Sequence, residues 1–106
     1  MLDRARLDAL ATSYLAGANP RDPAASPVFG DFSGVAPILV HVGAHEVLLG
    51  DALAVAQAAG AADVAVRLEI WPQMIHVWHG FADRLAEARR AVAASGAWMR
   101  ERLSQA

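Results

Sequence analysis

The sequence contains no cysteine and no lysine among its 106 residues. Without cysteine the chain forms neither disulfides nor thiolate metal sites, and a cysteine nucleophile is excluded. Its nine basic residues are all arginine, they form no run, and the formal net charge is −2, so nothing predicts a nucleic-acid-binding surface. No apolar stretch reaches the roughly 18 residues that a membrane span requires. We therefore expect a soluble, cytoplasmic protein without a membrane span.

The composition is that of a folded chain, because 56% of the residues are apolar. Alanine is the most frequent residue and mostly supports helix. At this length we expect a single segment with one core. The hydrophobic pattern divides it into a helix over 1–16, a loop over 17–37 with four prolines and three glycines, and a strand-helix-strand-helix unit over 38–106.

Two strands are predicted, at about 38–43 and 64–71, and about three helices, at 2–15, 47–59 and from 81 to the C-terminus. The run Ile38–Gly43 is almost wholly apolar, which is typical of a strand buried on both faces of a parallel sheet. A strand-helix-strand unit places its two strands in parallel. Two strands are few for such a sheet, so we expect the chain to be part of a larger α/β domain, unless a second copy or a partner carrying the upstream half completes the sheet.

Two chemically capable side chains follow the two predicted strands. Glu46 comes shortly after the first strand and His76 shortly after the second. Because parallel strands end at the same edge of the sheet, where sites of open α/β sheets gather, the two side chains can meet. A carboxylate beside an imidazole is the orienting half of a nucleophile-His-acid triad. The spacing therefore predicts a catalytic pair at this edge.

Four stretches carry a more specific resemblance: Tyr14-Leu-Ala-Gly17, Asp22-Pro-Ala-Ala-Ser-Pro27, Val42-Gly-Ala-His-Glu-Val-Leu-Leu49 and Trp71-Pro-Gln-Met-Ile-His-Val-Trp78. In this order and spacing they resemble the C-terminal third of hormone-sensitive-lipase-like α/β-hydrolases, in the bacterial esterase branch. The resemblance implies that the chain is a C-terminal fragment of an α/β-hydrolase fold. It further implies that Glu46, in place of the more usual Asp, is the acid and that His76 is the general base. Relatives often carry Asp where this chain has His45.

The nucleophile of that family is missing from the sequence. None of the five serines lies in a Gly-x-Ser-x-Gly motif, and the His-Gly-Gly oxyanion loop is absent too. The resemblance therefore implies a carboxylic-ester hydrolase segment that supplies the acid and His of a Ser-His-Glu triad and is inactive alone. Its substrate in the complete enzyme would be a small-molecule ester, and no cofactor is implied.

Several alternatives stay open at this stage. His79 also lies in a His-Gly-Phe context and competes with His76 for the role of base. Asp51 is either a solvated helix residue, which we favour, or a substitute acid. The four histidines lack a standard metal-ligand spacing, so no metal site is predicted. A non-catalytic α/β remnant that self-associates or docks on a partner is the alternative function.

Overall fold

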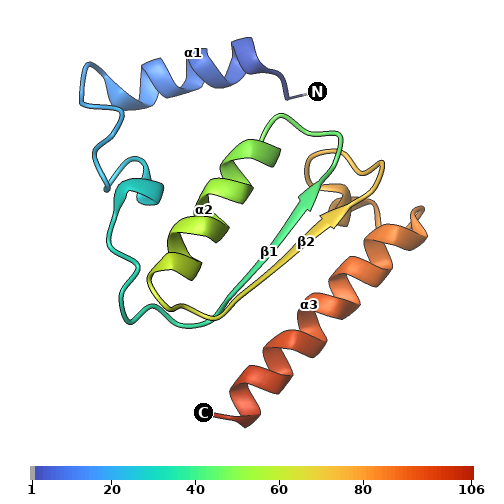
Figure 1. Ribbon diagram of the computed structural model, residues 1–106. Helices are drawn as coiled ribbons and strands as arrows, with labels where there is room; N and C mark the ends of the chain where they lie inside the picture. Colours follow the sequence, from blue (N-terminus) through green and yellow to red (C-terminus); the bar gives the residue numbers. More distant parts are fainter. Residues whose placement is uncertain (1) are drawn as a thin grey trace.

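The computed structural model describes residues 2–106 as three α-helices around a two-stranded parallel sheet (Figure 1). The elements follow in the order α1 (Arg4–Leu15), η1 (Pro27–Phe29), β1 (Ile38–Gly43), α2 (Leu49–Ala61), β2 (Val66–Trp71), η2 (Trp78–Phe81) and α3 (Ala86–Ser104), where η marks a short 3₁₀ helix. The predicted α/β fold with two parallel strands and three helices is confirmed. None of the helices within residues 2–106 is long and apolar enough to cross a membrane.

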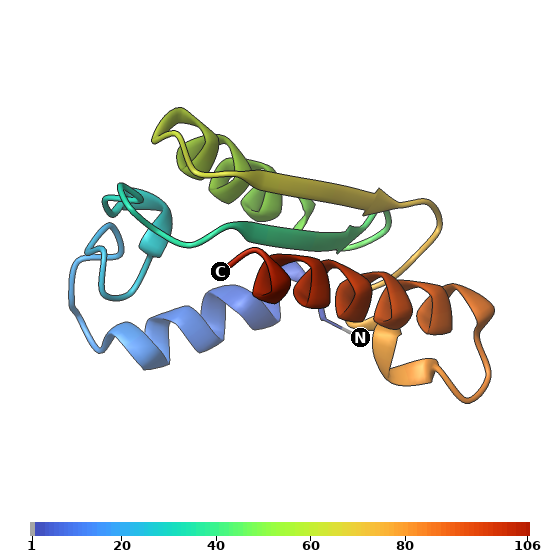
Figure 2. The same cartoon turned by 90° about the horizontal axis from the view of Figure 1, so that it is seen from below.

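The sheet pairs β1 with β2 in a register that runs from Ile38 opposite Val66 to Gly43 opposite Trp71. Helix α2 packs against one face of the sheet, and α3 lies on the other face (Figure 2). Strand β1 matches its predicted bounds, but only its last two residues are buried. Among the described residues β1 has a strand on one side only, which explains why its first four residues are partly buried instead of buried on both faces as predicted.

The best-buried cluster lies between η2 and α3. Trp78 is 1% exposed and packs with Ala88 and Ala91, while Trp71 and Met74 cover its rim. Two alanines one helical turn apart leave room for an indole ring against α3, so the small residues of this helix accept the largest side chain. This packing fixes the segment that follows β2, where His76 lies.

Several elements differ from the sequence pattern, and for α1 and β2 a specific local contact explains the difference. Helix α1 begins at Arg4, since the Asp3 side chain caps it by accepting the backbone N–H of Arg6 at 2.9 Å. Strand β2 begins at Val66, because the N–H of Val64 still donates to the Ala59 carbonyl at 3.1 Å. The segment 17–37, predicted to be a loop throughout, contains the short helix η1.

The last helix also starts later than predicted, at Ala86 instead of residue 81. The segment before it forms η2, and Leu85 adopts an extended backbone that separates η2 from α3. Helix α1 differs from the other two helices, because none of its residues is buried and it lies apart from the sheet (Figures 1 and 2).

Candidate active site

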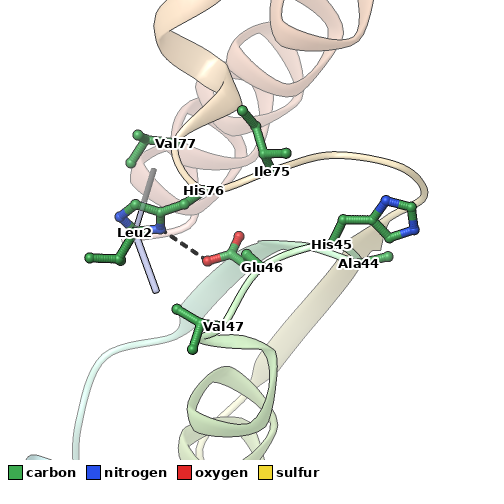
Figure 3. A pocket seen from close by; sticks show the side chains of 8 residues that line it. All are labelled: Leu2, Ala44, His45, Glu46, Val47, Ile75, His76 and Val77. Atoms are coloured by element: carbon green, nitrogen blue, oxygen red, sulfur yellow. Dashed lines mark hydrogen bonds and ion pairs between the residues drawn. The ribbon is translucent and has the colours of Figure 1, made fainter. Parts of the chain in front are cut away.

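The site lies where the two parallel strands end. The turn after β1, residues 44–48, and the loop after β2, residues 72–77, leave the same edge of the sheet and run side by side (Figure 3). One backbone hydrogen bond joins the turn to the end of β2, where the N–H of Ala44 donates to the Trp71 carbonyl at 2.9 Å. A second joins it to the loop, where the N–H of His45 donates to the Met74 carbonyl at 3.0 Å. The turn and the loop are therefore fixed relative to each other before any side chain is considered.

The structure brings together the two residues that the sequence selects. Nδ1 of His76 lies 3.0 Å from Oε1 of Glu46. The other carboxylate oxygen of Glu46 accepts the backbone N–H of Gly43 at 2.7 Å. Both oxygens are thus held, and the Glu46 side chain is only 6% exposed, whereas His76 is 38% exposed. A buried, fixed acid and an accessible imidazole are the arrangement in which an acid orients a base.

The contact also selects a tautomer of His76. A carboxylate accepts hydrogen bonds and does not donate them when ionised, so Nδ1 of His76 carries the proton that faces Glu46. The opposite nitrogen, Nε2, then has a free lone pair and can take a proton from a hydroxyl group. The pair can therefore act as a base with a fixed orientation.

The backbone on both sides of His76 adopts a conformation that ordinary residues avoid. Gln73 has φ 62° and Val77 has φ 51°, both in the left-handed region. This region is costly for residues with a side chain, and most of all for a β-branched one such as Val77. Such backbone strain concentrates at functional sites and costs about 1–3 kcal/mol per residue. The surrounding packing must hold these two residues in place.

Gly43 allows the loop to approach the end of β1. A Cβ at this position would overlap the carbonyl oxygen of Met74 and would lie 3.1 Å from Oε2 of Glu46. Only a residue without a side chain lets the His76 loop lie this close to the strand. The glycine is therefore part of the geometry that joins Glu46 to His76.

Alanine at Gly43 should separate the loop from β1, because the clash is with backbone and cannot be relieved by a rotamer change. We expect a loss of about 2–4 kcal/mol in the free energy of unfolding, measured with urea. Gly50→Ala is the matched control, since a Cβ at this α2 position meets nothing within 4 Å. It should be neutral or slightly stabilising. Equal stability of the two variants would contradict the role of Gly43.

A cavity of about 470 Å³ opens beside the pair. Its polar groups come from Glu46, His76 and His45, and the other lining residues are apolar: Leu2, Ala44, Val47, Ile75 and Val77. In Figure 3 the His45 ring points away from the Glu46 carboxylate and His76. Mostly apolar walls with a few convergent polar groups are typical of small-molecule sites.

The other two candidates lie elsewhere. Asp51 is in the first turn of α2, and in the described chain no hydrogen bond joins it to His76 or His79. His79 contacts His41 of β1 instead of an acid: its Nε2 lies 3.2 Å from Nδ1 of His41. The geometry therefore places His76, and neither alternative, in the acid-imidazole pair.

The surroundings of His79 were not predicted from the sequence. His41 and Glu69 stand opposite each other in the sheet register, and His41 Nε2 lies 3.1 Å from Glu69 Oε2. Burial lowers the pKa of His41 below its ordinary value, although the Glu69 charge opposes this, and burial also lowers the pKa of His79. The sequence carries no signal for this pair, because it depends on the strand register: the second strand is predicted to begin at residue 64 and begins at Val66. Within residues 2–106 no three His, Asp or Glu side chains converge to hold a metal ion.

A family model described as alpha/beta hydrolase fold matches residues 1–80. The chain belongs to this family. Its sequence is 49% identical over 100 residues to an acetyl-hydrolase of Streptomyces hygroscopicus. This alignment covers 94% of this chain and 33% of the relative. The putative acetyl-hydrolase LipR of Mycobacterium tuberculosis is 34% identical over 95 residues, covering 90% of this chain and 31% of the relative.

Solved structures agree with these sequence matches. A crystal structure of the α/β-hydrolase relative EstE5, soaked with p-nitrophenyl butyrate, aligns with a TM-score of 0.93 at 41% identity, over 96% of this chain and 35% of that one. An esterase from the bacterial hormone-sensitive lipase family aligns with a TM-score of 0.92 at 42% identity, over 95% of this chain and 34% of the esterase chain. The predicted resemblance to this branch is confirmed. This α/β-hydrolase chain spans about a third of the length of these relatives.

Proposed function

We propose that this chain supplies the acid and the general base of a carboxylic-ester hydrolase. The 3.0 Å contact between His76 Nδ1 and Glu46 Oε1 carries the proposal. In the reaction a serine hydroxyl attacks the ester carbonyl, and His76 Nε2 takes the hydroxyl proton. Glu46 holds the ring and stabilises its charged form, and His76 then returns the proton to the leaving alcohol.

The nucleophile and the oxyanion donors must come from outside these 106 residues, because the sequence has no Gly-x-Ser-x-Gly motif. The proposed substrate class is a small ester with a short acyl group. Its support is the likeness to proteins named acetyl-hydrolase. The apolar residues Val47, Ile75 and Val77 would contact the substrate there.

The purified chain should hydrolyse p-nitrophenyl acetate and p-nitrophenyl butyrate no faster than a His76→Ala variant, since both lack the serine nucleophile. Release of p-nitrophenolate, followed by absorbance, gives the two rates. Efficient turnover that disappears in His76→Ala would show that another group attacks the ester. The proposal that the nucleophile is a serine outside these residues would then be wrong.

A non-catalytic role is the second candidate, and the exposure of large apolar side chains favours it. Leu103 and Tyr14 are each 75% exposed, and Leu10 is 62% exposed. Such surfaces favour self-association or docking on a partner chain that completes the sheet. Sedimentation of the same preparation separates the candidates, because a stable folded monomer would count against the need for a partner.

A further inference from the structure

A second group of polar side chains lies behind the acid-imidazole pair, formed by Glu69 of β2, His41 of β1 and His79 of η2. Nε2 of His41 is 3.1 Å from Glu69 Oε2, and Nδ1 of His41 is 3.2 Å from Nε2 of His79. The His41 side chain is 6% exposed, and its ring stacks on those of His79 and Trp78. We call Glu69, His41 and His79 the relay. Its three members connect both strands to the loop that carries His76.

The Glu69 charge decides which nitrogens of the relay carry protons. The carboxylate is itself held by Arg67 at 2.7 Å and by the Trp71 indole N–H at 3.2 Å. The His41 contact is close but poorly aligned for a hydrogen bond, so it acts mainly through charge. A lone pair on Nε2 facing this anion would be repelled, whereas an N–H is attracted. His41 is therefore protonated on Nε2.

The protonation of His41 on Nε2 also determines which nitrogen of His79 carries a proton. With its proton on Nε2, His41 has a lone pair on Nδ1, which faces Nε2 of His79 at 3.2 Å. Only one proton can lie between two nitrogens at this distance, so His79 must donate it. The order of donors is thus set from the sheet outward: Glu69 attracts the N–H of His41, and His41 accepts the N–H of His79.

The relay anchors the part of the chain that follows His76. Before His76, the Met74 carbonyl accepts the N–H of His45. After it comes Val77 in its left-handed conformation, then buried Trp78, then His79 on His41. Burial of Trp78 resists withdrawal of the segment, but an apolar ring imposes little direction. The hydrogen bond of His79 adds that direction, because it holds only at one distance and angle.

The charged groups around the relay agree with this role. Glu69 and Arg67 act on His41 from β2, and Glu46 acts on His79 from the turn after β1. Helix α3 brings Ala88 and Ala91 to the packing around Trp78. Two positive rings 3.2 Å apart would repel each other, and burial lowers the pKa of both His41 and His79, so the pair works with both imidazoles neutral.

We propose that Glu69, His41 and His79 are positioning residues that hold the His76 loop against β1 and so keep His76 on Glu46. The proposal rests on the proposed function for its consequence, since it concerns the alignment of the general base. Its geometric part, the donor order of the relay, is independent of ester hydrolysis. None of the three residues contacts the reacting groups in this scheme.

Nitrogen-15 NMR of the histidine rings of the full chain tests the donor order, because each ring nitrogen reports whether it carries a proton. We expect His41 and His79 protonated on Nε2, and His76 protonated on Nδ1. In Glu69→Gln both tautomers of His41 should be populated, since an amide can either donate or accept a hydrogen bond. Glu101→Gln, at an exposed position of α3, is the matched control and should leave all four rings unchanged.

Two substitutions at His41 then test positioning. A glutamine amide offers both an acceptor toward His79 and a donor toward Glu69, so His41→Gln should preserve the loop. His41→Leu fills similar space without either group and should speed hydrogen exchange of the Gly80 amide, which donates to the Val77 carbonyl, about fivefold. It should also broaden the Nδ1–H resonance of His76. Far-UV circular dichroism confirms that both variants are folded.

The outcomes separate this proposal from the proposed function. If His41→Leu leaves the His76 resonance and the Gly80 exchange rate unchanged, the positioning role is wrong while the Glu46–His76 pair stands. If His76 in the unaltered chain carries its proton on Nε2 instead of Nδ1, the acid-base assignment fails whatever the relay does. His41 protonated on Nδ1 would overturn the donor order itself.

Discussion

Alanine at His76 is expected to lower kcat/KM for p-nitrophenyl acetate by about 10,000-fold in a chimera that joins this chain to the remaining part of a related acetyl-hydrolase. The chimera replaces the matched third of the Streptomyces hygroscopicus acetyl-hydrolase, which is 49% identical to this chain, with residues 2–106. Without the imidazole no group takes the serine proton, and only binding and oxyanion stabilisation remain. Steady-state kinetics of purified chimera and variant give the ratio.

The acid has its own test in the same chimera. Glu46→Gln keeps the size of the side chain but removes the charge that fixes and stabilises the His76 ring, so a loss on the order of 1,000- to 10,000-fold in kcat is expected. Glu101→Gln makes the same chemical change at an exposed position of α3 and should leave the rate unaltered. A Glu46→Gln chimera as active as the Glu101→Gln one would show that another carboxylate serves as the acid.

The base assignment is tested by comparison with His79. His79→Ala removes the side chain that contacts His41 but leaves the His76–Glu46 contact chemically possible. It should therefore lower kcat/KM of the chimera far less than His76→Ala does. If His79→Ala abolished the activity of the chimera and His76→Ala left it nearly unchanged, His79 would be the general base instead of His76.

The sequence predicts the elements of this fold well where apolar periodicity is strong. The almost continuous apolar run gives β1 with its bounds. The alternation that begins at Val64 and continues through Ile70 gives β2 to within two residues. The pairing of Glu46 with His76 also follows from sequence reasoning, because parallel strands must end at one edge of the sheet. These features depend on patterns that lie along the chain itself.

Features that depend on contacts between distant segments escaped prediction. The residues that end β1 and precede α2 form a turn, because the Glu46 side chain bonds back to the Gly43 N–H. Helix-like spacing continues through 81–85, yet the chain forms η2 and then an extended Leu85, since Trp78 must reach the space beside Ala88 and Ala91. His41 and Glu69 are unremarkable in sequence, and only the strand register makes them neighbours.

The packing of Trp78 gives the largest expected effect on stability. This side chain is 1% exposed, and Trp78→Ala would leave an indole-sized cavity between η2 and α3, at a cost of about 3–5 kcal/mol in the free energy of unfolding. That is a large part of the stability of a typical domain, so the variant should be mostly unfolded at 37 °C. Urea unfolding followed by circular dichroism measures the difference.

Trp98→Ala is the matched control for this prediction, because Trp98 lies further along α3, is only half-buried and contacts Arg102 outside the Trp78 cluster. Trp98→Ala should lower the free energy of unfolding markedly less than Trp78→Ala does. The comparison also bears on the site: Trp78 lies one residue after strained Val77, and its burial opposes the relaxation of that backbone. Relaxation would carry His76 away from Glu46. If Trp78→Ala is no more destabilising than Trp98→Ala, the loop geometry must be held by the Gly43 contact and the relay instead.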